Sequence, residues 1–266
     1  MIEIDYSGFD FDNPCYENIY RQRQEIYERL ASDTIELEKY KRYYATNPWL
    51  FINHWATIFD AQLLDQGKNP FVPFVPCIQR QKAAVTWMYE KFTKPEHGVL
   101  EAAEGCGARW LAIYFAIWVF IFRTGVVGFG STENNELDVR DNLDSVFQRI
   151  LNVLDRDRVP RFLLPKDFWP KKRSYPATYA NKRLENPVSG ANIVGELSGD
   201  IGHGNYSVYF VLDSVFKRMN AGKFKFQRSI RTDCRIEISK GSRRRAHIQQ
   251  RIEQFAGANQ YFLLSR

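Results

Sequence analysis

The feature that most constrains the fold is one continuous stretch, HGVLEAAEGCGARWLAIYFAIWVFIF, which covers residues 97–122. A short apolar pair, Val99 and Leu100, precedes a small glycine-bearing loop, and a long apolar run follows from Trp110 to Phe122. Strand, glycine loop and helix in that order form the shape of a phosphate-binding loop, in which backbone N–H groups and the helix dipole attract an anion. The apolar run is shorter than the roughly 20 residues that a membrane span needs, so we expect a buried helix and no membrane partner.

Apolar segments of strand length alternate with segments of helical spacing after residue 98. We expect strands at 99–100, 125–131, 207–213, 234–239 and 260–265, a pair of strands within 177–197, and helices at 16–46, 79–92, 109–123 and 135–155. This alternation predicts an α/β fold with a mostly parallel central sheet flanked by helices, in which ligands bind at the carboxyl ends of the strands. We place a helical N-terminal segment and lead-in at residues 1–70, and the α/β domain at residues 71–266.

Composition bounds the class of protein and its partners. The chain has 266 residues and is 44% hydrophobic, which suffices for one sizeable core or for one core with a small appendage. The net charge of +6 is compatible with a polyanion partner. Arg243, Arg244 and Arg245 can contact a DNA backbone, or they can form an ordinary solvated face. The four cysteines stand far apart, which predicts free thiols rather than disulfides or a zinc site. The acidic N-terminus does not predict a secretion signal.

The glycine loop and the strand before Asp213 supply the candidate chemistry. An acid at the end of that strand can reach the magnesium ion of a nucleotide bound at the loop. The candidate nucleotide contacts are Ala102, Glu104, Gly105, Cys106, Gly107, Ala108, Arg109 and Trp110. The simpler alternatives are a tight turn before a helix for EGCG and a solvated strand-end acid for Asp213. The residues by themselves leave both alternatives open.

Several segments occur in an order that resembles a known family. These segments are NPWLFINHWATIFD, NPFVPFVPCIQRQ, GARWLAIYFAIWVFIF, GVVGFGSTENNELD, VYFVLD and TDCRIEIS. Their order is similar to that in the ATPase domain of the large terminase subunit of tailed phages, the motor that pumps DNA into a procapsid. The resemblance covers most of the chain, from about residue 40 onward.

This resemblance implies a three-layer P-loop NTPase fold of the additional-strand class, with ATP and Mg²⁺ as ligands. It implies that Gln79 lies on the adenine side of the nucleotide. It also implies double-stranded DNA as the substrate, the portal and the small terminase subunit as partners, a homo-oligomeric ring, and a location in the host cytoplasm.

The sequence departs from this family at the positions that carry the chemistry. The family's loop has an early basic residue and a Ser or Thr after its last glycine, whereas this chain has Ala102, Ala103 and Glu104 early and Arg109 late. The family's Asp-Glu pair after the strand is here Asp213-Ser214, so Ser214 occupies the catalytic position in degenerate form. The coupling segment reads SKGSRRR, and we expect no nuclease domain.

These departures predict a strong loss of catalysis. Removal of the phosphate lysine discards a contact worth roughly 1.5–3 kcal/mol, and loss of the residue that orients water typically costs about 10²–10⁴ in rate. Arg109 can hold a phosphate bidentately, but it removes the hydroxyl that would hold magnesium. We therefore predict a terminase-like packaging ATPase domain with weak or lost hydrolysis. The alternative is a non-catalytic module, natural or redesigned, that binds DNA or motor subunits on the same scaffold, and whether the chain is an enzyme stays open.

Overall fold

A computed structural model gives the architecture of the chain, and it describes residues 3–6, 8–10, 12–74, 78–102, 106–140, 142–154, 158–166, 168, 179–180, 182–197, 204–212, 235–240 and 261–264. The elements follow in the order α1 (Glu17–Ser32), α2 (Thr34–Thr46), α3 (Pro48–Trp55), β1 (Thr57–Phe59), α4 (Ala61–Asp65), β2 (Phe71–Pro73), α5 (Ile78–Thr93), β3 (Gly98–Ala102), α6 (Ala108–Phe122), β4 (Val126–Ser131), α7 (Asn134–Leu137), α8 (Val146–Leu154), a 3₁₀ turn (Arg161–Leu163), β5 (Tyr179–Ala180), β6 (Arg183–Glu185), β7 (Asn192–Leu197), β8 (Val208–Val211), β9 (Arg235–Lys240) and β10 (Tyr261–Leu264).

Among the described residues, the main sheet has the strand order β10-β3-β9-β8-β4-β7-β6-β5. The six strands from β10 to β7 are parallel, whereas β6 and β5 continue the sheet in antiparallel pairing. A separate antiparallel ribbon joins β1 to β2. The predicted α/β class with a mostly parallel sheet is therefore confirmed. The range 177–197, predicted as a pair of strands, holds three, because the first predicted strand is divided into β5 and β6.

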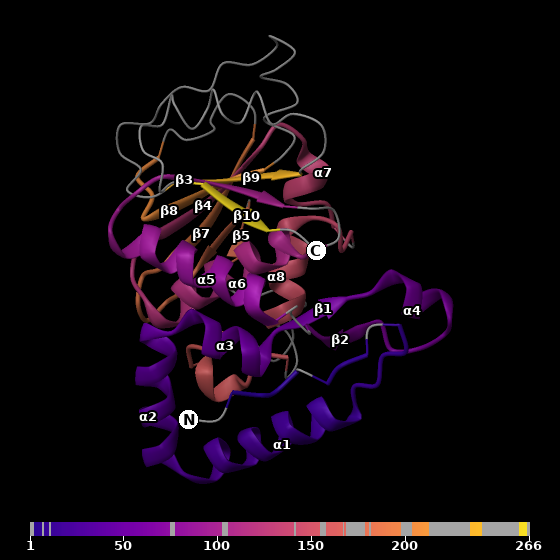
Figure 1. The fold of residues 1–266 in the computed structure, drawn as a ribbon. Helices are drawn as coiled ribbons and strands as arrows, with labels where there is room; N and C mark the ends of the chain where they lie inside the picture. The colour runs from indigo at the N-terminus through magenta and orange to yellow at the C-terminus, as the bar shows by residue number, and fades with distance from the viewer. Residues whose placement is uncertain are drawn as a thin grey trace.

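Helices α5, α6 and α8 pack on one face of this sheet (Figure 1). Strand residues that share this face are Phe262, Leu100, Ile238, Ile236, Phe210, Phe129 and Gly195, which neighbour one another through the strand registers. Phe115 of α6 meets Phe210 with ring centroids 6.3 Å apart, and Trp87 of α5 meets Phe262 at 5.8 Å. The described part of the chain thus shows a sheet with a helical layer on this face, and the three-layer arrangement stays a prediction.

Helix α6 is the centre of the hydrophobic core. Every residue from Leu111 to Phe120 has no exposed surface, because the helix is apolar on all sides and is covered by the sheet, by α5 and by the N-terminal helices. The predicted buried helix is confirmed. In the part of the chain that the structure describes, no helix is both long and apolar enough to cross a membrane.

Two predicted helices are each divided in the structure. The helix predicted at 16–46 is broken at Asp33, whose backbone is extended and whose carboxylate accepts hydrogen bonds from the N–H groups of Ile35 and Glu36. A side chain that caps a new helix competes with continuation of the old one, which the amphipathic spacing does not reveal. The helix predicted at 135–155 is α7 followed by α8, with irregular backbone at 138–140 and 142–145.

The N-terminal helices share the core of the sheet rather than standing apart from it. Buried residues from Ile4 to Ile238 form one hydrophobic cluster, and the indole of Trp118 in α6 donates a hydrogen bond to the main-chain oxygen of Tyr44 in α2. Asn53 in α3 exchanges hydrogen bonds with the backbone of Ile4. The predicted boundary at residue 70 is not tested by these contacts and stays a prediction.

Tyr44 holds a buried polar cluster within this core. Its hydroxyl lies 2.8 Å from Nδ1 of His54 and accepts a hydrogen bond from the indole of Trp55 at 3.0 Å. Burial raises the pKa of the Tyr44 phenol far above its ordinary value, so the hydroxyl keeps its proton at every pH near neutral.

We expect the substitution Tyr44→Phe to lower the free energy of unfolding by about 2–4 kcal/mol, because it removes the oxygen that two buried side chains share. Urea denaturation followed by tryptophan fluorescence measures this loss. Tyr43→Phe is the matched control, since Tyr43 is 36% exposed and lies one residue away, and it should change stability by less than about 0.5 kcal/mol. Equal effects of the two substitutions would contradict the assigned role of the cluster.

Candidate functional site

The candidate site lies at the carboxyl edge of the parallel sheet. Strand β3 leads through the loop into α6, and β8 ends at the same edge with β9 between the two. Adjacent strands lie about 4.8 Å apart, so the axes of β3 and β8 are separated by roughly 10 Å. The strand before the glycine loop, β3, and the strand before Asp213, β8, are therefore near neighbours in one sheet.

Several predicted site residues lie outside the described residues. Glu104, Gly105, Asp213 and Ser214 are among them, as are Arg243, Arg244 and Arg245, and the same holds for the side chain of Gln79. Their predicted roles stay predictions. The described part of the site consists of Ala102, residues 106–110, and the side chains that surround them.

Gly107 ends the loop and begins α6. Its φ of +80° is in the left-handed region, where a side chain is strained. A Cβ atom on Gly107 would also lie 3.1 Å from the ring of Phe74. The main-chain oxygen of Gly107 accepts the first hydrogen bond of α6, from the N–H of Leu111. Glycine is thus required here by local geometry, for a tight turn that presents the start of a helix at the sheet edge.

Gln81 supports this loop, and the sequence analysis did not single it out. Its Nε2 donates a hydrogen bond of 2.8 Å to the main-chain oxygen of Cys106. Only 5% of the residue is exposed. Its other amide atom, Oε1, is buried and has no hydrogen-bond partner among the described residues. A signal was present in the sequence: Gln81 shares helical spacing with Ala84, Val85 and Met88, which form the buried face of α5.

Arg109 forms an ion pair with a neighbouring side chain of the site. Its guanidinium lies 3.0 Å from Oε1 of Glu136, and the hydroxyl of Ser131 lies 2.7 Å from the second carboxylate oxygen. The two charged side chains are 25% and 15% exposed, so solvent screens this pair only in part. Glu136 belongs to the first turn of α7, which follows β4.

A second arginine lies close to the first. The guanidinium of Arg149 in α8 stacks over the ring of Trp110 at 4.7 Å. It also bonds to the carboxylate of Asp144 and to the main-chain oxygen of Leu143. Burial, and then the positive charge of Arg109, lower the pKa of Arg149 from its ordinary value. Two cations are therefore held near the first turn of α6, each with an internal partner.

The small residues of the predicted site serve packing. Ala102 and Ala108 are only 4% and 6% exposed and belong to the hydrophobic cluster. Cys106 is a buried free thiol. Trp110 stacks on Tyr114 with ring centroids 6.2 Å apart. A group of His, Cys, Asp or Glu side chains able to hold a metal ion is not found within the described ranges, which do not include Asp213.

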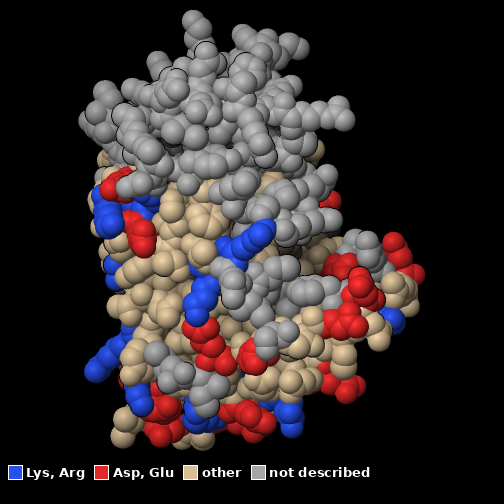
Figure 2. Space-filling view, viewed as in Figure 1, with Lys and Arg blue, Asp and Glu red and all other residues tan. Residues whose placement is uncertain are grey.

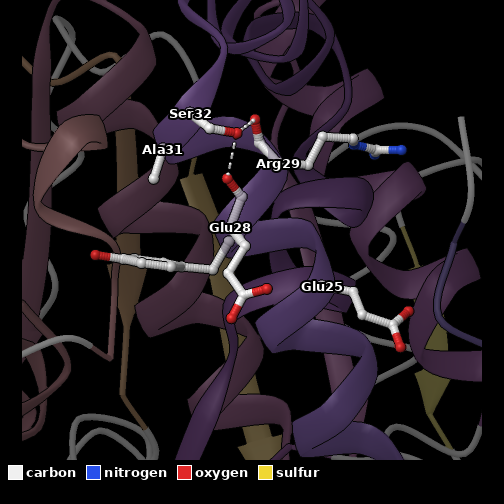
Figure 3. A pocket seen from close by; sticks show the side chains of 6 residues that line it. Glu25, Glu28, Arg29, Ala31 and Ser32 are labelled. Atoms are coloured by element: carbon white, nitrogen blue, oxygen red, sulfur yellow. Dashed lines mark hydrogen bonds between the residues drawn. The ribbon is translucent and has the colours of Figure 1, made fainter.

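A shallow pocket on α1 does not compete with this site (Figure 3). It is lined by Glu25, Tyr27, Glu28, Arg29, Ala31 and Ser32. The Ser32 hydroxyl is bonded to main-chain oxygens of its own helix, at 2.7 Å from that of Glu28 and 3.2 Å from that of Arg29. The polar atoms that line this pocket do not converge on a common point, as a specific ligand site requires.

Charge on the face seen in Figure 2 does not single out a nucleic-acid interface. In the view of Figure 2, basic and acidic side chains are interspersed over the N-terminal helices, and acidic ones gather over the projecting segment that contains α4. Asp60 and Asp65 belong to that segment. The predicted DNA contact at residues 243–245 lies outside the described residues.

Comparisons with known proteins do not assign this geometry to a family. No protein-family model matches the chain. No curated protein matches it either. The function therefore has to be argued from the carboxyl edge of the sheet and the side chains gathered there.

Proposed function

We propose that this chain is a terminase-like DNA-packaging ATPase domain in which ATP hydrolysis is weak or lost. The observation that carries the proposal is the strand order around the loop. In the additional-strand class of P-loop NTPases, one extra parallel strand separates the strand before the loop from the strand that ends in the metal-binding acid. Here β9 lies between β3 and β8, and all three are parallel.

The side chains around the loop support binding on the base side of a nucleotide. Gln81 lies against the loop, and its Oε1 is a buried acceptor without a partner among the described residues. A buried acceptor of this kind is costly unless a donor reaches it. The exocyclic amino group of adenine is a donor of suitable chemistry. Gln81 is thus a candidate for contact with the base, beside Gln79, whose implied role stays a prediction.

The side chains support phosphate binding only in part. The left-handed Gly107 and the first turn of α6 offer backbone N–H groups and the positive end of a helix dipole. Arg109 replaces the hydroxyl that would hold magnesium, and its guanidinium is bound to Glu136. This chain's own residues would orient the base and cradle the phosphates, while the metal would rely on Asp213. Weak binding and slow or absent turnover follow from this donor set.

The proposal predicts measurable but weak nucleotide binding. At a Mg-ATP concentration ten times the dissociation constant, we expect stabilisation by about 1.4 kcal/mol, which corresponds to a rise in Tm of about 2–3 °C for a chain of this size. Differential scanning fluorimetry with a titration from 0.1 to 10 mM nucleotide measures it. GTP is the control ligand, because its base presents a carbonyl where adenine presents the amino group, and it should stabilise less.

One observation favours the non-catalytic alternative: Arg109, the cation in the first turn of α6, is already paired with Glu136. If neither ATP nor ADP raises the Tm at 10 mM, the ATPase proposal fails. DNA binding that weakens steeply with salt would then support a module that contacts phosphates through its basic residues.

A further inference from the structure

The Arg109–Glu136 pair lies at a particular place on the sheet edge. Arg109 is in the first turn of α6, directly after the loop, while Glu136 follows the carboxyl end of β4. Strand β4 neighbours β8, and the N–H of Leu212 donates to the main-chain oxygen of Gly130 at 3.0 Å. The pair therefore spans the edge between the loop and the strand whose end precedes Asp213.

The carboxylate of Glu136 is held in position by a contact other than the one with Arg109. Its Oε2 lies 2.7 Å from the hydroxyl of Ser131, a residue with no exposed surface. The same hydroxyl oxygen lies 3.0 Å from the N–H of Glu133, which fixes the turn between β4 and α7. Because one oxygen is anchored in this way, the other is presented to the guanidinium at 3.0 Å with little loss of side-chain freedom.

A guanidinium binds carboxylates and phosphates through the same hydrogen-bonding edge. Any phosphate group that approaches the start of α6 must therefore compete with Glu136 for Arg109. The neighbouring guanidinium of Arg149 is less available still, because it bonds to Asp144 and Leu143 and stacks on Trp110.

We propose that Glu136 is an internal competitor for the guanidinium of Arg109 and limits the affinity of this edge for anions of the phosphate class. The relevance to nucleotides rests on the proposed function, but the competition itself does not. Release of Arg109 adds one charge-assisted contact to a bound anion, so affinity should rise about 10- to 100-fold when Glu136 loses its charge.

The test is calorimetric titration of the full chain with inorganic pyrophosphate without added metal. Glu136→Gln should bind pyrophosphate about 10- to 100-fold more tightly than the wild type, because glutamine keeps an acceptor for Ser131 but does not hold a guanidinium as a carboxylate does. The double variant Arg109→Gln/Glu136→Gln should lose this gain. Glu136→Asp, which retracts the carboxylate by one methylene, should give a smaller gain, and it serves if the glutamine variant does not fold.

Glu133→Gln is the matched control, since Glu133 is an exposed carboxylate three residues away, and it should leave pyrophosphate affinity unchanged. The proposal is overturned if Glu136→Gln or the aspartate variant binds pyrophosphate no better than the wild type, or if the gain persists without Arg109. Its failure is distinct from that of the proposed function: the nucleotide proposal concerns adenine binding by the wild type, whereas this one concerns the difference between variants with a ligand that has no base.

Discussion

Replacement of Ala116 with aspartate should abolish folding. Ala116 has no exposed surface and lies in the middle of α6, where every neighbour from Leu111 to Phe120 is equally buried. A carboxylate there would lose its hydration without gaining a partner, a cost of several kcal/mol at the least, and its larger side chain would also overpack the contact between α6 and the sheet. The free energy of unfolding of a domain is about 5–15 kcal/mol, so this single change is expected to remove most or all of it.

The measurement is circular dichroism combined with size-exclusion chromatography. Ala116→Asp should appear in inclusion bodies or as an expanded, non-cooperative species. Ala83→Asp is the matched control, because Ala83 is an exposed alanine inside a helix, α5, and that variant should fold with a loss of about 1 kcal/mol or less. A soluble, cooperatively unfolding Ala116→Asp protein would show that α6 is not the core helix described above.

Restoration of the family's residue types should raise ATP turnover by about 10²–10⁴ over the wild type, the range that a positioned general base contributes. The structure changes how this variant is built. Lysine at Ala102 would be buried in the core, so the basic residue is introduced by Glu104→Lys. Arg109→Thr would leave the carboxylate of Glu136 without its cation, so Glu136→Gln is added, and Ser214→Glu completes the set.

Turnover is followed by phosphate release with saturating Mg-ATP. The control is the same four-residue variant with Asp213→Asn, which should return to the wild-type rate if Asp213 acts on the metal as proposed. An inert four-residue variant that still binds Mg-ATP would move the defect to the segment SKGSRRR. An active variant that is insensitive to Asp213→Asn would contradict the metal role assigned to that residue.

Much of the fold was predictable because its signals are local. Helix α5 was predicted at 79–92 and is found at Ile78–Thr93, and the five strands predicted singly are each found within about two residues of their predicted ends, apart from the loop strand, which is longer. These elements are marked by apolar runs bounded by glycine, proline or charge. The break at Asp33 was missed since a cap forms from one side chain and leaves the apolar spacing on both sides intact.

The candidate site was less predictable for a physical reason. The sequence analysis did not single out Gln81, which the structure brings against the loop because that residue falls on the buried face of α5. It offered Arg109 as a free cation, whereas the structure pairs it with Glu136, 27 positions further along the chain. The helical spacing of Gln81 indicates burial but not its partner, and Glu136 has no local signal of its contact with Arg109, since each contact depends on which elements lie together in space.

The sequence by itself determined that a buried helix, predicted at 109–123, follows a glycine turn, and that parallel strands alternate with helices around it, because burial and backbone preference act on neighbours along the chain. Only the tertiary structure decided that β9 separates β3 from β8, that Gln81 supports the loop and that Glu136 neutralises Arg109. Those facts come from strand pairing and packing between distant segments, where the energy of a contact depends on the position of both partners and not on the identity of either alone.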